Sequence, residues 1–147
     1  MGTQNASLRR HPDWPLRLSG FIKASQNLAF QWGINDCSLW VADAVLCLTG
    51  HDFSEAWRGR YKSLDELREI VENEYGGKVE NIVIDALGDP IPFPRKAQRG
   101  DVVLVDDDDL GTIGIVDDTG RYVAMLSIDR GLARVRITDS MKVWHYG

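Results

Sequence analysis

Cys37 is the residue with the clearest capacity for chemistry, and it lies in the segment WGINDCSLW, residues 32–40. Asn35 and Asp36 are residue types that cap helices, so we expect a helix to begin at Asp36 or just after it. At a helix N-terminus the macrodipole and the free backbone N–H groups favour a thiolate, the reactive form of cysteine. Cys37 also lies on the apolar stripe of this predicted helix, as a buried structural cysteine would. The residues alone leave both interpretations open.

A cysteine nucleophile needs a base, and the chain has three histidines. His51 follows Cys37 by fourteen residues, about 20 Å along a helix axis, which is too far for proton transfer. His11 belongs to an N-terminal segment, residues 1–12, that we expect to be an extended arm without fixed geometry. His145, in the last predicted strand, is a weak alternative base that could reach the sheet face against the helix. The competing interpretation of His145 is an exposed histidine on an edge strand.

The other groups with redox or metal chemistry give weaker signals. Cys47 lies ten positions after Cys37, about 15 Å along the same helix, so the two cannot form a disulfide. Two unpaired thiols are typical of a reducing compartment, and we expect Cys47 to be shielded and inert. The acidic run DDDD, residues 106–109, lacks the ligand spacing of a calcium loop and is expected to be a solvated turn, with cation binding left open. We predict no metal site and no cofactor.

The composition is that of one acidic domain. The chain has 147 residues, 44% of them hydrophobic, which suits a single core. A net charge of −5 argues against general binding to nucleic acid, which needs a basic surface. No apolar run reaches the roughly 18 residues of a membrane span, and we expect neither a span nor a leader peptide. We therefore predict a single domain over residues 13–147.

Helical patterns precede strand patterns along the chain. Helices are expected from Pro15, from about Asp36 to Thr49, from the capping box at Ser63, and over VENIVIDALG. After Gly100 the chain holds β-rich runs separated by turn residues. This order predicts an α+β fold, with N-terminal helices and a central buried helix packed on a C-terminal antiparallel β-sheet. We expect the central contact to join Trp40, Val41, Ala44, Val45 and Leu48 to Val102, Leu104, Ile113 and Ile115.

Several of these motifs, in this order, resemble the NlpC-type cell-wall cysteine peptidases, a circularly rearranged papain-like fold. The segments FQWGINDCSLWVADAVLCLTG, RGDVVLV and TIGIVDDTGRYV carry the resemblance. A small phage and prophage branch of that family shares further motifs with the chain. They are DW at 13–14, the WG and DC pairs within 32–37, TGHD at 49–52, RGRY at 58–61, GG at 76–77, AQRGDVVLV at 97–105 and Trp144. The resemblance spans nearly the whole chain.

The resemblance implies roles for two residues. Cys37 corresponds to the family's nucleophile, the candidate catalytic residue. Thr112 stands at the position of the family's histidine, and a threonine hydroxyl cannot act as a general base near pH 7. The resemblance therefore implies a cysteine peptidase fold and leaves the peptidase activity open.

Three functional hypotheses follow. The first is a structural or assembly protein of a phage tail tip with a degenerate NlpC-type fold, in contact with other proteins of the tail tip or baseplate hub. The second is an active peptidoglycan cysteine peptidase or amidase that uses Cys37 and recruits a base such as His145. The third is an unrelated small-ligand or regulatory domain. The resemblance implies a location in the virion tail after synthesis in the cytoplasm of the bacterial host.

Overall fold

The computed structural model describes residues 8–147, in which four α-helices precede a five-stranded antiparallel sheet. The helices are α2 (Trp14–Ala24), α3 (Cys37–Thr49), α4 (Leu64–Tyr75) and α5 (Val79–Leu87), followed by the short 3-10 helix η1 (Pro94–Lys96). The strands are β1 (Val102–Asp106), β2 (Thr112–Val116), β3 (Tyr122–Ser127), β4 (Gly131–Arg136) and β5 (Lys142–Trp144). Their order is β4-β3-β2-β1-β5, and all neighbours are antiparallel. The predicted α+β fold is confirmed. Within residues 8–147 no helix has the length and apolar character needed to cross a membrane.

Helix α3 begins and ends where its sequence predicts. The Asp36 carboxylate accepts a hydrogen bond from the Leu39 N–H at 2.9 Å and so caps the first turn. Gly50 ends the helix in the left-handed conformation, with φ of 80°, which a residue with a side chain rarely adopts. Ser63 and Gly76 bound α4 in the same two ways. Local capping therefore sets the limits of both helices.

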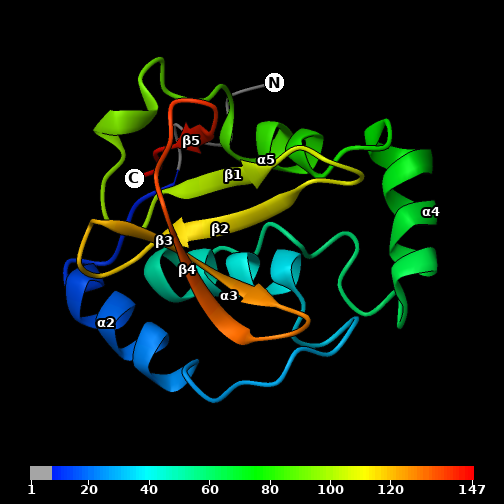
Figure 1. The fold of residues 1–147 in the computed structure, drawn as a ribbon, viewed down its shortest axis with the longest axis horizontal. Coiled ribbons are helices and arrows are strands. Elements are labelled where there is room, and N and C mark those ends of the chain that lie inside the picture. The colour runs from blue at the N-terminus through cyan, green and yellow to red at the C-terminus, as the bar shows by residue number, and fades with distance from the viewer. Residues whose placement is uncertain (1–7) are drawn as a thin grey trace.

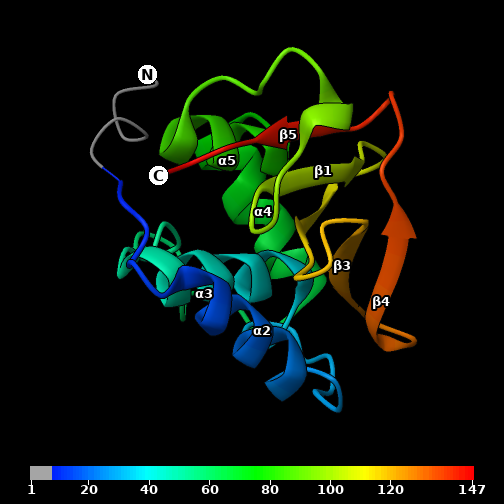
Figure 2. The ribbon, with the colours of Figure 1, turned by 90° about the vertical axis from the view of Figure 1, so that its left-hand side faces the viewer.

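The helices cover one face of the sheet, and α3 lies directly against β2 and β3 (Figures 1 and 2). The predicted contact is confirmed, because its residues belong to one buried core. They are Trp40, Val41, Ala44, Val45 and Leu48 of α3, and Val102, Leu104, Ile113 and Ile115 of the sheet. Burying one such aliphatic or aromatic side chain is worth roughly 1.5–3 kcal/mol. This core fixes the position of the N-terminus of α3, and with it Cys37, beside the first residues of β2.

The opposite face of the sheet carries a second, smaller apolar cluster. Val103, Val123 and Val143 alternate with the residues of the main core along their strands, so their side chains point to the other side. The loop between α5 and β1 contributes Ile91 and Ala97 to this cluster, and Ile137 after β4 completes it. The sheet is therefore covered on both faces.

The N-terminal segment contacts the opposite end of the chain. Residues 1–7 of the predicted arm lie outside the part that the structure describes. Arg10, which belongs to the described part of the arm, forms three hydrogen bonds. Its Nε donates to the Tyr146 carbonyl at 2.9 Å, Nη1 donates to the Arg99 carbonyl at 2.8 Å, and Nη2 donates to Asp101 at 3.1 Å. The side chains of Arg10 and Asp101 are only 4% and 1% exposed. Arg10 therefore joins the start of the described chain to its end through the hydrogen bond to Tyr146, and to the start of β1 through a buried ion pair with Asp101.

Candidate functional site

Cys37 opens onto a pocket of about 390 Å³ at the N-terminal end of α3. The loop before α3, the first residue of β2, and the β3–β4 hairpin enclose it. Most of the lining is apolar and comes from Phe30, Trp32, Val105, Met125, Ile128 and Val135. The polar lining consists of the Cys37 thiol, the hydroxyls of Thr112 and Ser127, and the exposed carboxylate of Asp106 at the end of β1. The site is thus an apolar hollow with a thiol at the end of the central helix.

The turn that presents Cys37 is built around Asp36. Its buried carboxylate accepts hydrogen bonds from the Leu39 N–H at 2.9 Å, the Gly33 N–H at 3.0 Å and the Tyr61 hydroxyl at 2.5 Å. Gly33 has a φ of 81°, and a Cβ there would lie 2.1 Å from the Tyr61 carbonyl oxygen. Only glycine permits this approach, which explains the Trp-Gly pair ahead of the cysteine. Tyr61 in turn holds the carboxylate in place.

The electrostatic setting keeps the Cys37 thiol protonated. Burial, the larger cause, and the negative charge of Asp36 together raise the pKa of Cys37 from 9.0 to about 11. The Ser38 hydroxyl, 3.9 Å from the sulfur, and the backbone of Ile113 favour the thiolate but do not offset those two effects. Of the two interpretations that the sequence leaves open for Cys37, this setting favours the buried structural cysteine. Withdrawal of the sulfur from water outweighs the macrodipole.

Thr112 lies in the same pocket as Cys37. It is the first residue of β2, and the backbone of the next residue, Ile113, lies beside the Cys37 sulfur. The structure thus places in one pocket the two residues to which the motif resemblance assigns the nucleophile and histidine positions. The threonine hydroxyl offers a hydrogen-bonding group at that position and no titratable base.

His145 lies far from the Cys37 pocket. Its Nδ1 is 2.8 Å from Oδ1 of Asp101, the residue that precedes β1. That end of β1 packs on the C-terminal end of α3, since a Cβ on Gly100 would lie 3.0 Å from Leu48. The 13 residues of α3 separate this end from Cys37, about 18 Å at the rise of an α-helix. In this structure His145 cannot accept a proton from Cys37.

The other two histidines lie at the same distant end of α3. The backbone N–H of His11 donates to the Leu48 carbonyl at 2.8 Å. His51 follows Gly50, the residue that ends α3. Within residues 8–147, which include all three histidines, none lines the Cys37 pocket. The site therefore has a thiol without an imidazole.

Cys47 is less shielded than its sequence predicts. It is partly buried, and its Sγ lies 3.9 Å from the Arg17 carbonyl oxygen of α2. Burial raises the pKa of Cys47, while the charge of Arg17 opposes the rise. Its neighbour Leu46 is 39% exposed, so this side of α3 reaches the surface. The apolar residues around the whole helix suggested full burial, but α2 covers only part of that side.

Basic side chains contact the acidic run at residues 106–109. Arg68 forms an ion pair with Asp109, and Lys78 Nζ donates to the carbonyls of Asp107 and Asp109 at 3.0 and 2.8 Å. In residues 8–147 no three or more His, Cys, Asp or Glu side chains group in a way that could hold a metal ion. The run is a turn held by cationic partners from α4 and from the residue before α5.

A second hollow, of about 770 Å³, adjoins the first and was not predicted from the sequence. The two share Phe30, Trp32 and Ile128 and so lie side by side, and we call them together the Cys37 groove. Ile34 and Ile128 on this groove are 55% and 62% exposed. The aromatic residues in FQW, just ahead of the cysteine motif, are the only local signal for it. Such an apolar groove suits an extended chain or a ligand with apolar groups.

The comparisons with known proteins give one match. A family model described as a domain of unknown function, DUF6950, matches residues 9–146. No curated protein and no solved structure matches the chain. The family match covers the helices, the sheet and the Cys37 groove alike. The chain therefore belongs to the DUF6950 family.

Proposed function

We propose that this protein is a non-hydrolytic relative of the NlpC-type peptidases that serves as a structural or assembly component of a phage tail tip. The observation that carries the proposal is the pairing of Cys37 with Thr112 in a pocket that no histidine lines. The pKa of about 11 for Cys37 supports it, because the thiol is then protonated at neutral pH. The tail-tip setting rests on the motif resemblance, and with it a location in the virion tail.

In this proposal the Cys37 groove is a binding surface. Its apolar lining and the exposed side chains of Ile34 and Ile128 suit contact with an apolar segment of a neighbouring tail protein. The Asp36 hydrogen bonds give the groove a fixed shape, which lowers the entropy that binding must overcome.

The alternative is an active peptidoglycan cysteine peptidase or amidase. It requires a base at Cys37, and the location of all three histidines at the far end of α3 argues against it. General-base assistance typically contributes 10²–10⁴-fold to rate, so hydrolysis without it falls close to the limit of detection. The two functions therefore differ in the rate at which the protein hydrolyses peptidoglycan.

A digestion assay tests the choice between them. Purified protein is incubated with peptidoglycan sacculi, with a known wall hydrolase as the positive control, and released fragments are followed by mass spectrometry. We expect no difference between the unmodified protein and Cys37→Ala. Digestion by the unmodified protein that Cys37→Ala abolishes would establish the peptidase instead.

A gain of reactivity tests the site itself. The substitution Thr112→His should place an imidazole in the Cys37 pocket and increase the rate of Cys37 alkylation by iodoacetamide at pH 7, because an imidazole can take up the thiol proton. Thr138→His, at an exposed threonine outside the pocket, is the matched control and should leave that rate unchanged. Equal rates in both variants would mean that Thr112 does not face the sulfur as proposed.

The location in the particle needs its own experiment. Tail particles assembled with the protein present are purified and analysed by quantitative mass spectrometry and cross-linking, in the unmodified and Cys37→Ser forms. We expect a fixed copy number in the particle, or association with tail intermediates during assembly, for both forms. Complete assembly in a strain that lacks the protein would contradict the structural role.

A further inference from the structure

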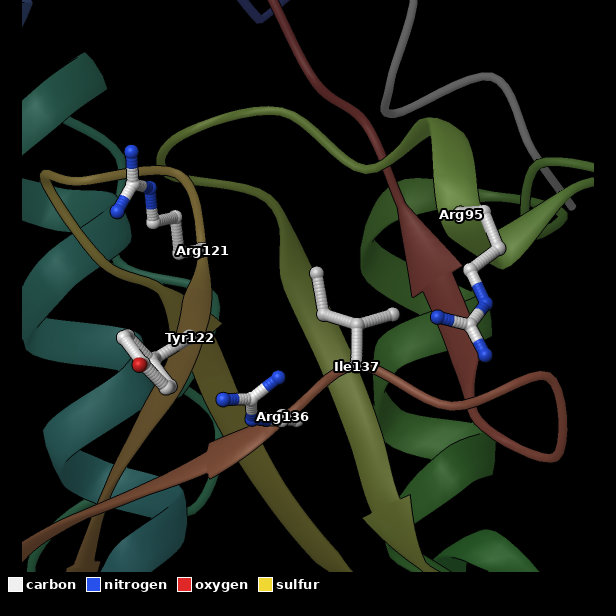
Figure 3. Close-up of a pocket in the computed structure, with 5 residues that line it drawn as sticks. All are labelled: Arg95, Arg121, Tyr122, Arg136 and Ile137. Carbon is white, nitrogen blue, oxygen red and sulfur yellow. The ribbon is translucent and has the colours of Figure 1, made fainter.

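Three arginines line a separate pocket of about 390 Å³ on the sheet (Figure 3). Arg95 comes from η1, Arg121 lies directly before β3, and Arg136 ends β4. Tyr122 and Ile137 complete the lining. The fold thus brings three arginines to one pocket from segments up to 41 residues apart, 95 and 136, in a chain with a net charge of −5. This arginine pocket lies at the start of β3, whereas the Cys37 pocket lies at its end.

The strand pairing determines how the arginine pocket is arranged. Tyr122 and Arg136 are cross-strand partners in the β3–β4 ladder, and the Arg136 guanidinium carbon lies 6.0 Å from the centroid of the Tyr122 ring. In Figure 3 the Arg136 guanidinium lies between Tyr122 and Ile137, and Arg95 lies on the other side of Ile137. The exposed Arg121 side chain extends away from these two. The aromatic ring and Ile137 provide apolar surface between the cationic groups.

The arginines in this pocket are largely uncommitted. Within residues 8–147, Arg121 and Arg136 form no ion pair, and Arg95 pairs only with Asp139 at 2.8 Å. The Arg95 and Asp139 side chains are 65% and 80% exposed, so solvent screens this pair strongly. Arg134, close by on β4, differs because it pairs with the buried carboxylate of Asp117. The pocket therefore presents three cationic groups against one exposed carboxylate.

We infer that the arginine pocket binds the dianionic phosphate group of a small phosphate monoester. Guanidinium groups match phosphate oxygens in geometry and form paired hydrogen bonds to them. Once the exposed Arg121 side chain turns toward the ligand, the three arginines less Asp139 carry an excess of two positive charges. This excess matches the charge of about −2 of a phosphate monoester near neutral pH. Its volume suits one small ligand, and Tyr122 and Ile137 would contact the organic part. The inference does not depend on the function of the Cys37 groove.

Binding of defined probes tests the inference. Phosphoserine, inorganic phosphate, diethyl phosphate and acetate are titrated into the full-length protein at constant ionic strength and pH 7.5, followed by two-dimensional amide NMR. We expect phosphoserine and inorganic phosphate to shift the amides of residues 121, 122, 136 and 137. The monoanions diethyl phosphate and acetate should bind at least tenfold more weakly. Equal binding of the diester would overturn the assignment of a dianion.

Variants separate the pocket from general charge attraction. Arg136→Gln should weaken phosphoserine binding tenfold or more. Arg130→Gln, which removes an exposed arginine of the β3–β4 turn that does not line the pocket, should leave it unchanged. Asp139→Asn frees Arg95 and should tighten binding severalfold, a gain that misfolding cannot produce. Equal losses in Arg130→Gln and Arg136→Gln, or no gain in Asp139→Asn, would overturn the inference.

The pH dependence gives a further check. The second pKa of a phosphate monoester is about 6, so the probe loses its second charge between pH 7 and pH 5. The five lining residues include no histidine and no carboxylate, and Asp139 is the carboxylate paired with Arg95. Phosphoserine binding should therefore weaken severalfold from pH 7 to pH 5. Affinity that stays constant over this interval would contradict recognition of the dianion.

Discussion

At the scale of single residues, the state of Cys37 follows from the sizes of opposing effects. A helix N-terminus typically stabilises a negative charge by about 0.3–1 kcal/mol, less than one pKa unit. The pKa of Cys37 instead rises from 9.0 to about 11, because burial and the Asp36 charge act in the other direction. The position of Cys37 at the start of α3 was predictable from its neighbours. Its protonation state was not, because burial depends on the strands and loops that enclose the sulfur.

This difference predicts the order in which the two thiols react. At pH 8 a thiol with a pKa of about 11 is ionised in about one molecule per thousand. The Cys47 sulfur is less deeply buried and lies near Arg17, so we expect iodoacetamide to label Cys47 faster than Cys37. This order reverses the one that the sequence suggests. Peptide mass spectrometry over time measures both rates, with Cys37→Ser and Cys47→Ser as controls, and faster labelling of Cys37 would indicate a thiolate there.

The pH dependence of the same reaction gives a second prediction. The Asp36 charge contributes to the raised pKa of Cys37, so Asp36→Asn should lower that pKa, although burial keeps it above the ordinary value of 9.0. The rate of Cys37 alkylation increases with pH between pH 8 and pH 11, and in the variant this increase should begin at a lower pH. A Cys47→Ser background isolates the signal. An unchanged profile would mean that the Asp36 charge does not reach the sulfur.

At the scale of elements, local signals located the helices well and missed the contacts that join them. Asp36 and Gly50 bound α3, and Ser63 and Gly76 bound α4, because capping depends on residues within a few positions. The hydrogen bond from Tyr61 to Asp36 joins positions 25 apart. Tertiary packing alone brings them together, so no local pattern reveals it. The same holds for the Cys37 groove, whose walls come from separate loops and strands.

The turn before α3 should therefore be sensitive to the acceptor at position 36. Asp36→Ala removes the helix cap and leaves the Leu39 N–H, the Gly33 N–H and the Tyr61 hydroxyl without their acceptor. Loss of a cap costs about 1 kcal/mol, and unsatisfied buried donors add about 1–3 kcal/mol. We expect a decrease of about 2–4 kcal/mol in the free energy of unfolding, measured by urea denaturation.

Two milder substitutions at this turn, Asp36→Asn and Tyr61→Phe, should lower the free energy of unfolding less than Asp36→Ala does. Asp36→Asn keeps an oxygen for the Leu39 N–H but directs its NH₂ group toward the Gly33 N–H, so its loss should be intermediate. Tyr61→Phe removes one donor and should cost about 1 kcal/mol. A loss in Asp36→Ala no larger than in Tyr61→Phe would show that the carboxylate does not organise the turn.

At the scale of the whole molecule, the two ends of the described chain are fastened to each other at β1. Arg10 reaches Asp101 and the Tyr146 carbonyl, and its guanidinium carbon lies 4.5 Å from the centroid of the Tyr146 ring. The pair Arg10–Asp101 spans 91 positions. The sequence around Arg10 holds little to bury, so the segment suggested an arm. A partner this distant in sequence could not be inferred from composition or spacing.

Arg10→Met tests how much these contacts of Arg10 stabilise the fold. A methionine fills part of the space but leaves the buried Asp101 carboxylate without its guanidinium, and removing one member of a buried ion pair typically costs about 3–5 kcal/mol. Urea denaturation followed by tryptophan fluorescence should show a loss of that size. Arg9→Met, at the exposed neighbour, should stay within about 0.5 kcal/mol of the unmodified protein.

The pH dependence of that loss identifies its cause. Burial already raises the pKa of Asp101, while Arg10 and His145 oppose the rise, so removing Arg10 raises the pKa further. A carboxyl group with a raised pKa in the folded state binds its proton more readily there than in the unfolded chain. The folded state is therefore penalised above that pKa and relieved as the pH falls through it. The decrease in the free energy of unfolding that Arg10→Met causes should accordingly be largest near neutral pH and become smaller toward pH 4.

A double variant gives an independent check. In Arg10→Met with Asp101→Asn, the decrease in the free energy of unfolding should be smaller than the sum of the two single decreases, because the unpaired charge is absent. A deficit independent of pH and additive in the double variant would mean that Arg10 acts through packing against Trp14 and Tyr146 alone.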